Sequence, residues 1–161
     1  MNDRELTIQE IHFVQINAEN VLQICSLSET LPPDQRSAVS DNAVSIAQAH
    51  CSENVWMRAI YYGDEPVGFI MLHIGSDWAD GIDCPGVFLW RLMITHQHQR
   101  RGYGEAAMVE LINHLKALGI PELYTSYHLG EGSPERFYRK LGFTPTGEYY
   151  GDEPEVKLII D

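Results

Sequence analysis

The chain has 161 residues, of which 44% are hydrophobic, and its 23 acidic and 11 basic side chains give a formal net charge of −12. Its length and composition indicate one globular domain, residues 1–161, with a single core. Excess negative charge repels nucleic acid and attracts cations, so a small cationic partner is expected and a nucleic-acid partner is not. No run approaches the roughly 18 apolar residues that cross a bilayer. Without a signal-like N-terminus, we expect a cytoplasmic protein with no membrane partner.

The first half of the chain predicts a strand, two helices and a hairpin. Apolar and polar residues alternate loosely at the start, and Asn17 is a suitable cap for the helix that follows. The prolines at 32 and 33 interrupt that helix, and an apolar stripe then predicts a second one. The expected elements are a strand at 6–14, a helix after Asn17, a helix from Asp34 to about residue 50, and hairpin strands at 55–62 and 67–74 around a turn at 63–66.

In the second half, residues 87–94 form the most apolar run and predict a central strand buried on both faces. The polar segment 75–86 before it, with three aspartates, is expected to be a surface loop. Ser133 is a suitable N-cap, with Pro134 at the first helical position. The remaining elements are expected as a helix at 104–118, a strand at 122–128, a helix from 134 to Gly142, and strands at 143–149 and 155–160.

The cysteines and histidines do not predict a metal site. Cys25, Cys51 and Cys84 are far apart and form no C-x-x-C pair, so reduced thiols are expected. His96 and His98 are the closest histidine pair, and no third ligand lies near them in the sequence. We therefore expect no metal and no disulfide framework.

A glycine-containing turn follows the central strand, with the sequence Gln99-Arg100-Arg101-Gly102-Tyr103-Gly104-Glu105. Glycine lets a ligand approach the main chain, and the free N–H groups at a helix start suit a phosphate or pyrophosphate. A structural turn with two solvated arginines is the simplest alternative. A dinucleotide fold is a second one, since Gly102, Gly104 and Ala107 fit G-x-G-x-x-A, but too little chain follows for a doubly wound domain. A phosphate-binding P-loop is excluded because no Gly-Lys-Ser/Thr follows.

A second motif, Phe137-Tyr138-Arg139-Lys140-Leu141-Gly142-Phe143, makes the assignment specific. The turn resembles the Q/R-x-x-G-x-G/A pyrophosphate-binding turn of the GNAT superfamily of N-acetyltransferases, and the second motif is similar to that superfamily's F-Y-x-K-L-G-F signature. The resemblance implies the α/β GNAT fold, a mixed sheet of six to seven strands flanked by four helices. It also implies acetyl-CoA as the co-substrate of an N-acetyltransferase, with a homodimer as a family-level expectation.

The resemblance implies which residues contact the cofactor. The expected set comprises Leu92, Met93, Ile94, Gln99, Arg100, Arg101, Gly102, Tyr103, Gly104, Glu105 and Ser133. In this set, backbone N–H groups at residues 92–94 face the thioester carbonyl. The sequence departs from the family at Glu131, where many members carry an asparagine that helps to hold the pantetheine arm. Ser133 is the residue expected to take over that contact.

The chemistry of acetyl transfer requires an acid for the leaving thiolate and a base for the incoming ammonium. The resemblance assigns the acid to Tyr138, because the matching tyrosine of the family points at the CoA sulfur; simple helix packing is the alternative. No acid lies on strand 87–94, so His128, acting through water, is the base to test. A structural or solvated histidine is the alternative for His128.

The acceptor is expected to be a small cationic amine. Residues 89–94 and Ser40-Asp41-Asn42 are similar to bacterial spermine/spermidine and diamine N-acetyltransferases. Loop carboxylates at Glu29, Asp34, Glu148 and Glu153 are the expected substrate contacts, although for any single one of them a solvated loop acid is the favoured interpretation. An acetyltransferase for another amine, such as a protein N-terminus, a lysine or an aminoglycoside, is an open alternative. So is a non-catalytic CoA-binding module.

Overall fold

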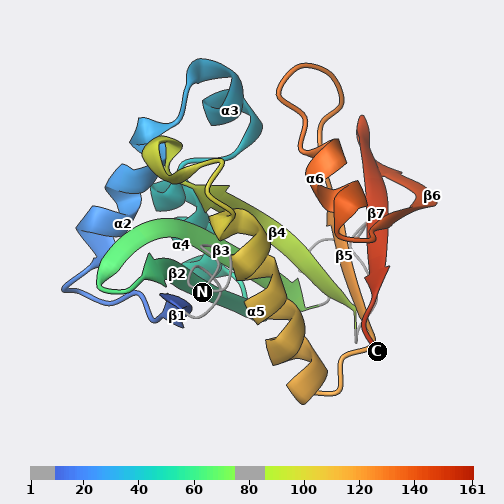
Figure 1. Ribbon diagram of the computed structural model, residues 1–161, viewed down its shortest axis with the longest axis horizontal. Coiled ribbons are helices and arrows are strands. Elements are labelled where there is room, and N and C mark those ends of the chain that lie inside the picture. Colours follow the sequence, from blue (N-terminus) through green and yellow to red (C-terminus); the bar gives the residue numbers. More distant parts are fainter. Residues whose placement is uncertain (1–9, 75–85) are drawn as a thin grey trace.

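The computed structural model describes residues 10–74 and 86–161, in which helices cover both faces of a seven-stranded mixed sheet (Figure 1). The strand order is β1-β2-β3-β4-β5-β7-β6. The elements are β1 (Ile11–Val14), α2 (Val21–Leu27), η1 (Ser28–Thr30), α3 (Pro33–Ala38), α4 (Asn42–Cys51), β2 (Val55–Tyr62), β3 (Glu65–Ile74), β4 (Val87–Ile94), η2 (His96–His98), α5 (Tyr103–Ala117), β5 (Glu122–Ser126), α6 (Glu135–Lys140), β6 (Thr144–Tyr150) and β7 (Glu153–Ile159).

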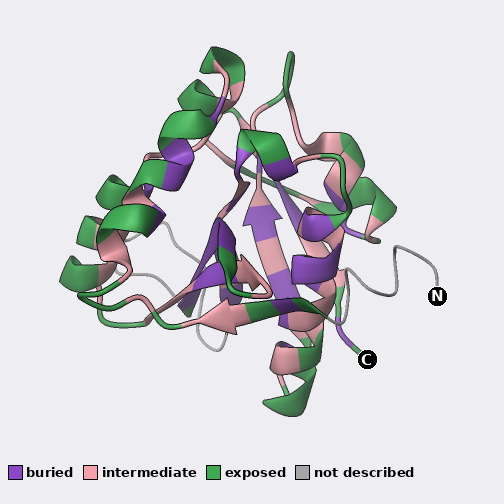
Figure 2. Ribbon diagram, turned by 60° about the vertical axis from the view of Figure 1, so that its left-hand side comes forward, coloured by how far each residue is buried: buried purple, intermediate pink, exposed green. Residues whose placement is uncertain are grey.

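Two apolar clusters, one on each face, hold the helices to the sheet (Figure 2). On the first face, Met108, Leu111 and Leu115 of α5 are buried against β3, β4 and β5, together with Tyr138 of α6. On the second face, Ile24 of α2 is buried with side chains of β2, β3 and β4. Burying a large apolar side chain stabilises the fold by about 1.5–3 kcal/mol, so these contacts dominate the packing.

The two strands at the centre of the sheet, β4 and β5, separate along their length. In the described residues they pair in parallel at Phe88 and Tyr124, and beyond that pair they diverge (Figure 1). On its other side β4 stays paired with β3, except at a bulge where Met71 opposes Arg91 and Leu72 opposes Leu89. Trp90 is the extra residue at this bulge. The sheet is therefore continuous on one side of β4 and open on the other.

The structure confirms the α/β fold class and the order of elements, and it corrects the second helix. The helix expected from residue 34 to 50 is two helices, because Val39 is extended (φ −126°, ψ 128°). The buried Asn42 fixes the break: its N–H donates to Ser28 Oγ at 3.0 Å and its side-chain amide donates to Ile24 O at 2.8 Å. The polar segment expected to be a loop lies, apart from residue 86, outside the described residues.

The first helix also starts later than expected. It begins at Val21, and the side chain of Asn17 instead organises the preceding turn, accepting hydrogen bonds from the N–H groups of Glu19 and Asn20 at 2.9 and 3.2 Å. An asparagine that bonds to its own following backbone favours such a turn as much as a helix cap. The sequence pattern alone does not distinguish the two.

Gly68 sets how closely β3 can approach the end of β4. A Cβ added there would collide with the carbonyl oxygen of Met93 and lie 2.9 Å from Cδ1 of Ile94. We expect Gly68→Ala to lower the free energy of unfolding by about 1–3 kcal/mol, the usual cost of overpacking. Gly104→Ala is the control, since its Cβ would meet Phe137 at 3.5 Å, an ordinary contact. Urea denaturation of the parent and of both variants measures these free energies of unfolding. Equal stabilities of Gly68→Ala and Gly104→Ala would contradict the prediction.

Candidate active site

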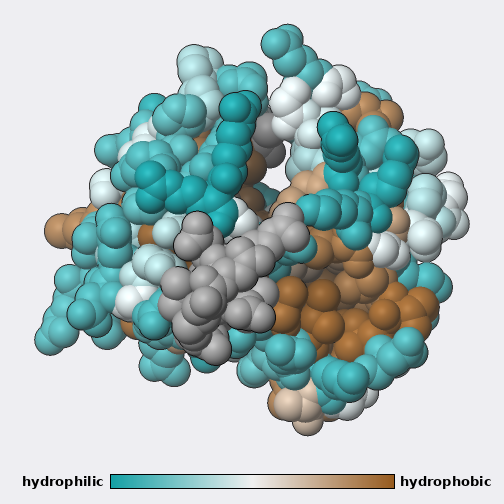
Figure 3. All heavy atoms as spheres, in the orientation of Figure 1, coloured by the Kyte–Doolittle hydropathy of each residue, from teal (hydrophilic) through white to brown (hydrophobic). Residues whose placement is uncertain are grey.

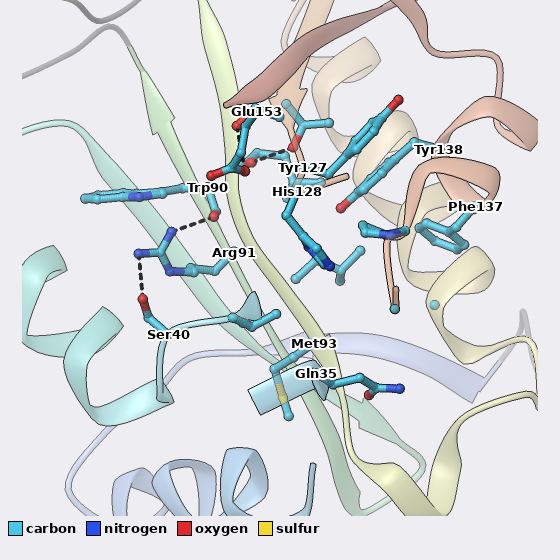
Figure 4. Close-up of a pocket in the computed structure, with 18 of the residues that line it drawn as sticks. Gln35, Ser40, Trp90, Arg91, Met93, Tyr127, His128, Phe137, Tyr138 and Glu153 are labelled. Atoms are coloured by element: carbon cyan, nitrogen blue, oxygen red, sulfur yellow. Dashed lines mark hydrogen bonds between the residues drawn. The ribbon is translucent and has the colours of Figure 1, made fainter. Parts of the chain in front are cut away.

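A cavity of about 760 Å³ lies where β4 and β5 diverge. Figure 3 shows the molecule hollowed at this opening, and Figure 4 shows the side chains that project into it. One side of the cavity is formed by β3, β4, the turn after β4 and the α3–α4 region. The other side is formed by β5, the segment that follows β5, α6 and the β6–β7 turn. The lining residues are Leu31, Gln35, Val39, Ser40, His73, residues 88–94, Gln99, Gly104, residues 125–128, Gly132, Pro134, Phe137, Tyr138, Tyr150, Gly151 and Glu153.

Strand β4 forms one wall of this cavity, and this corrects the expectation that it is buried on both faces. Val87, Leu89 and Met93 are buried, but the strand's other five residues are only partly so. These five residues are Phe88, Trp90, Arg91, Leu92 and Ile94, and all five line the cavity. An apolar strand beside a cleft gives the same sequence pattern as one between two packed layers.

The glycine turn contains two residues with left-handed backbone conformation, a feature that also occurs in anion-binding nests. Arg100 and Gly102 both have positive φ, at 63° and 83°. Positive φ in a residue with a side chain is uncommon, and alternating conformations of this kind turn successive N–H groups toward one point. The first N–H groups of α5 have no acceptor within the helix and add to this. Arg100 and Arg101 are exposed beside the turn, so positive charge surrounds it.

Gln99 ties this turn to the rest of the site. Its side-chain nitrogen donates to Ile94 O at 2.9 Å and to Gln35 Oε1 at 2.7 Å. The end of β4, the turn and α3 are thereby held together. Gln99 also lines the cavity, as expected for a residue of the turn.

The other residues of the turn divide between the cavity and the core. Gly104 lines the cavity beside Phe137 and Ile94, and its lack of a side chain leaves room there. The Tyr103 ring is buried and stacks on Tyr62 with ring centroids 5.0 Å apart. The side chain of Tyr103 therefore belongs to the core, and its backbone N–H is the part of the residue that lies in the turn. Glu105 forms an ion pair with Lys140 of α6 at 3.4 Å.

The Tyr138 side chain reaches the inside of the cavity from α6. Its ring is buried and stacks nearly parallel on Tyr127, with centroids 5.8 Å apart. Figure 4 shows its hydroxyl directed into the cavity, whereas that of Tyr127 points away. Burial raises the pKa of Tyr138 well above its usual value, and a hydrogen bond with Thr125 opposes part of that shift. The hydroxyl therefore stays protonated through the neutral and moderately alkaline range.

His128 and Ser133 lie on the segment between β5 and α6. His128 lines the cavity, and its Nε2 is 3.2 Å from Glu131 O. The Oγ of Ser133 accepts a hydrogen bond from the Glu135 N–H at 3.2 Å, as a capping side chain does, and Ser133 is not among the lining residues. The structure thus brings His128 and Tyr138 to one cavity and gives Ser133 a structural contact.

Of the four carboxylates expected to bind the acceptor, Glu153 is the one that lines the cavity. It accepts a hydrogen bond from Ser126 Oγ at 3.3 Å. Glu29 and Glu148 are exposed and are not among the lining residues. Asp34 is exposed beside Gly132, where α3 meets the segment before α6. A carboxylate on a loop near a site in the sequence need not point into that site.

The sequence interpretation missed Arg91, which also lines the cavity. Its Nη1 donates to Trp90 O at 2.9 Å, and its Nη2 donates to Ser40 Oγ at 3.1 Å and Gln48 Oε1 at 3.3 Å. Burial lowers the pKa of its guanidinium, and the charge of Glu153 opposes part of that shift. A lone arginine inside the most apolar strand of the chain is the signal that could have identified it.

The described residues contain no group of three or more histidine, cysteine, aspartate or glutamate side chains that could hold a metal ion. The same part of the chain has no helix that is long and apolar enough to cross a membrane.

The chain matches the acetyltransferase (GNAT) family over residues 22–143. Similar solved structures include an acetyltransferase from Thermus thermophilus (15% identity, covering 92% of this chain and 96% of that one, TM-score 0.75). The Escherichia coli ribosomal-protein-S18-alanine N-acetyltransferase is 14% identical over 94% of each chain, with a TM-score of 0.68. The PaiA N-acetyltransferase of Thermoplasma acidophilum, solved with coenzyme A, is 15% identical over 92% of this chain and 98% of that one, with a TM-score of 0.64.

These identities show a shared fold, and the family match covers most of the chain. The protein belongs to the GNAT family of acetyltransferases. The family assignment made from the glycine turn and the second motif is thereby confirmed.

The position of Gly104 gives a test of the cofactor contact. We expect Gly104→Val to weaken CoA binding at least tenfold, because its methyl groups would fill space at the cavity wall beside Phe137 and Ile94. Titration calorimetry with CoA and urea denaturation of the same variant provide the comparison. A variant that loses stability but keeps its CoA affinity would show that Gly104 serves packing alone.

Proposed function

We propose that this protein transfers the acetyl group of acetyl-CoA to the primary amine of a small acceptor, by direct attack in a ternary complex. The observation that carries the proposal is the cavity that joins the turn before α5 to the hydroxyl of Tyr138 along the open side of β4. Acetyl-CoA supplies an activated thioester. The chain's residues bind it, orient the amine and move the protons.

The turn at residues 99–104 fits the pyrophosphate of acetyl-CoA. The positive φ values of Arg100 and Gly102 and the unpaired amides at the start of α5 suit a doubly charged anion. The PaiA enzyme of the same fold was solved with coenzyme A. We propose that the backbone of Leu92, Met93 and Ile94, on the side of β4 that β5 leaves open, holds the pantetheine arm. The N–H groups of this stretch would hydrogen-bond the thioester oxygen as charge develops on it.

Tyr138 is the proposed acid. As the carbon–nitrogen bond forms and the carbon–sulfur bond breaks, the tyrosine O–H gives its proton to the departing sulfur. The amine loses a proton in the same reaction, and His128 is the proposed acceptor of it through water. The tyrosine then regains a proton from solvent and His128 releases its proton to solvent, so both groups return to their starting state.

The acceptor predicted from the sequence is a polyamine or diamine, and the net charge of −12 favours any cationic substrate. Among the described residues that line the cavity, Glu153 is the carboxylate and Arg91 is the guanidinium. We therefore propose a small primary amine as the acceptor class, with polyamines as the second candidate. We also propose that residues 1–161 form one domain and that the protein is a homodimer.

The direct test of this function measures CoA release and the acetylated product with a panel of amines. The panel contains spermidine, putrescine, cadaverine, amino acids, an alanine-terminated peptide and an aminoglycoside. We expect saturable turnover with at least one small primary amine. Binding of acetyl-CoA without transfer to any member would instead support the alternative of a CoA-binding module.

Tyr138→Phe tests the proposed acid. Because the ring is kept, stability and CoA affinity should change little, while the maximal rate falls about 100-fold or more at neutral pH. The loss should shrink above about pH 8.5, where a departing thiol needs its proton less. Since burial raises the pKa of Tyr138, ionisation of this residue should not reduce the parent's rate below about pH 10.

Tyr127→Phe is the matched control for this experiment. Tyr127 is as buried as Tyr138 and stacks on it, but its hydroxyl points away from the cavity (Figure 4). Its removal should leave the pH profile of the maximal rate unchanged. Equal losses in the two variants would show that the rate does not depend specifically on the hydroxyl that enters the cavity, and would remove Tyr138 from the chemistry.

A further inference from the structure

Arg91 occupies a position in the cavity that neither acetyl-CoA binding nor the proposed proton transfers use. The bulge at Trp90 is what places it there. In a regular strand, neighbouring side chains point to opposite faces, but an extra residue shifts the alternation by one. Leu89 and Leu92 pack with the α5 face, whereas Trp90 and Met93 pack with the α2–α4 face. Arg91 contacts Ser40 and Gln48, so it lies on the latter face as well.

The guanidinium is held rigidly but is not fully satisfied. It makes three hydrogen bonds, to Trp90 O, Ser40 Oγ and Gln48 Oε1, and it lies 5.3 Å from the Trp90 ring centroid. A guanidinium has five N–H groups, so one on Nη1 and that on Nε remain. Nε is buried without an acceptor. Because Nε is enclosed by protein atoms, a bound acceptor group would meet the guanidinium at its remaining Nη1 N–H.

The charges around Arg91 select the kind of group that fits. In the described part of the chain, no carboxylate lies within 4.0 Å of it, and its three hydrogen-bond partners are uncharged. Glu153, on the opposite wall formed by β7, is held by Ser126 and is close enough to influence the Arg91 charge. One fixed positive and one fixed negative charge therefore face the same cavity. A polycation complements only Glu153, whereas a molecule with both an amine and a carboxylate complements both.

The position along β4 sets the size of that molecule. Arg91 is one to three residues from Leu92–Ile94, the stretch proposed to face the thioester. At about 3.3 Å per residue, the backbone of Arg91 lies about 3–10 Å along the strand from the stretch proposed to hold the reacting carbon. That span suits an amine separated from a carboxylate by a few bonds.

We propose that the acceptor is a small amino acid-like amine, and that Arg91 binds its carboxylate and so determines specificity. This inference rests on the proposed acetyltransferase function and names its substrate class. Charge-assisted hydrogen bonds of a guanidinium to a carboxylate are among the strongest that a protein makes, and Arg fits this planar group better than Lys does.

The test compares amino acids with the amines that remain when the carboxylate is removed: lysine with cadaverine, ornithine with putrescine, tyrosine with tyramine, and phenylalanine with phenethylamine. Each pair differs at the carboxylate alone. For the parent protein, we expect kcat/KM for the preferred amino acid to exceed that of its partner at least tenfold, the effect of one charged hydrogen bond. Arg91→Met should bring this ratio close to one, mainly by raising KM for the amino acid, and Arg91→Lys should give an intermediate ratio.

Arg58→Met is the matched control. Arg58, on β2, repeats the local contacts of Arg91: its Nη1 donates to Met57 O at 2.7 Å and its guanidinium lies 4.8 Å from the Trp56 ring centroid. It is not among the residues that line the cavity. Its replacement should leave both the ratio and the rates unchanged. A parent protein that prefers the decarboxylated amine in every pair would overturn the inference, as would an Arg91→Met variant that retains the ratio.

The same pairs also separate this inference from the acetyltransferase proposal. If no amine is acetylated, the proposed function fails, and calorimetry with the same compounds in the presence of CoA then decides the role of Arg91. Binding that needs the carboxylate and is lost in Arg91→Met would support the inference. Equal binding of both members of every pair, or binding of neither, would overturn it.

Discussion

The separation of β4 from β5 is the constraint on which the rest of the site depends. Two parallel strands that begin as neighbours, at Phe88 and Tyr124, would normally continue to exchange backbone hydrogen bonds. Here they do not, and the released edge of β4 becomes one wall of a cavity inside an otherwise continuous sheet. Buried backbone groups must find partners. A strand opened in this way therefore provides donors and acceptors that a bound substrate can use.

The cavity has two chemically different halves. Toward the α5 face it is bordered by the turn after β4, Gly104, Phe137 and Tyr138, a combination of backbone amides and aromatic rings. Toward the α2–α4 face it carries Arg91 and Ser40, with Glu153 on the far wall. We propose that the first half holds the acetyl donor and the second holds the acceptor. The transfer would then take place at the end of β4, where the halves meet.

The sequence predicted the elements of this fold well because most of them have strong local patterns. Strand Val55–Tyr62 and strand Val87–Ile94 have the bounds that their apolar runs indicated. The break between α3 and α4 was missed, since it depends on Asn42 reaching Ser28 and Ile24, contacts between segments distant in the sequence. The bulge at Trp90 was missed for the same reason, because it is a property of the pairing of β4 with β3.

For the site, the motif residues were easier to predict than the acceptor side. The turn and Tyr138 occupy short, recognisable segments, and the structure places Gly104, Gln99, His128 and Tyr138 in one cavity. The direction of a loop carboxylate has no such local signal, so Glu153 lines the cavity while Glu29 and Glu148 do not. The side to which Arg91 points depends on a single extra residue in a strand pair.

A crystal structure of the protein with coenzyme A would test the central claim most directly, that the opening between β4 and β5 is the acetyl-donor site. The account predicts the pyrophosphate at the amides of residues 99–104, the pantetheine arm along Leu92–Ile94, and the sulfur within hydrogen-bonding distance of the Tyr138 hydroxyl. Coenzyme A bound elsewhere on the molecule, or bound here with its sulfur directed away from Tyr138, would contradict it.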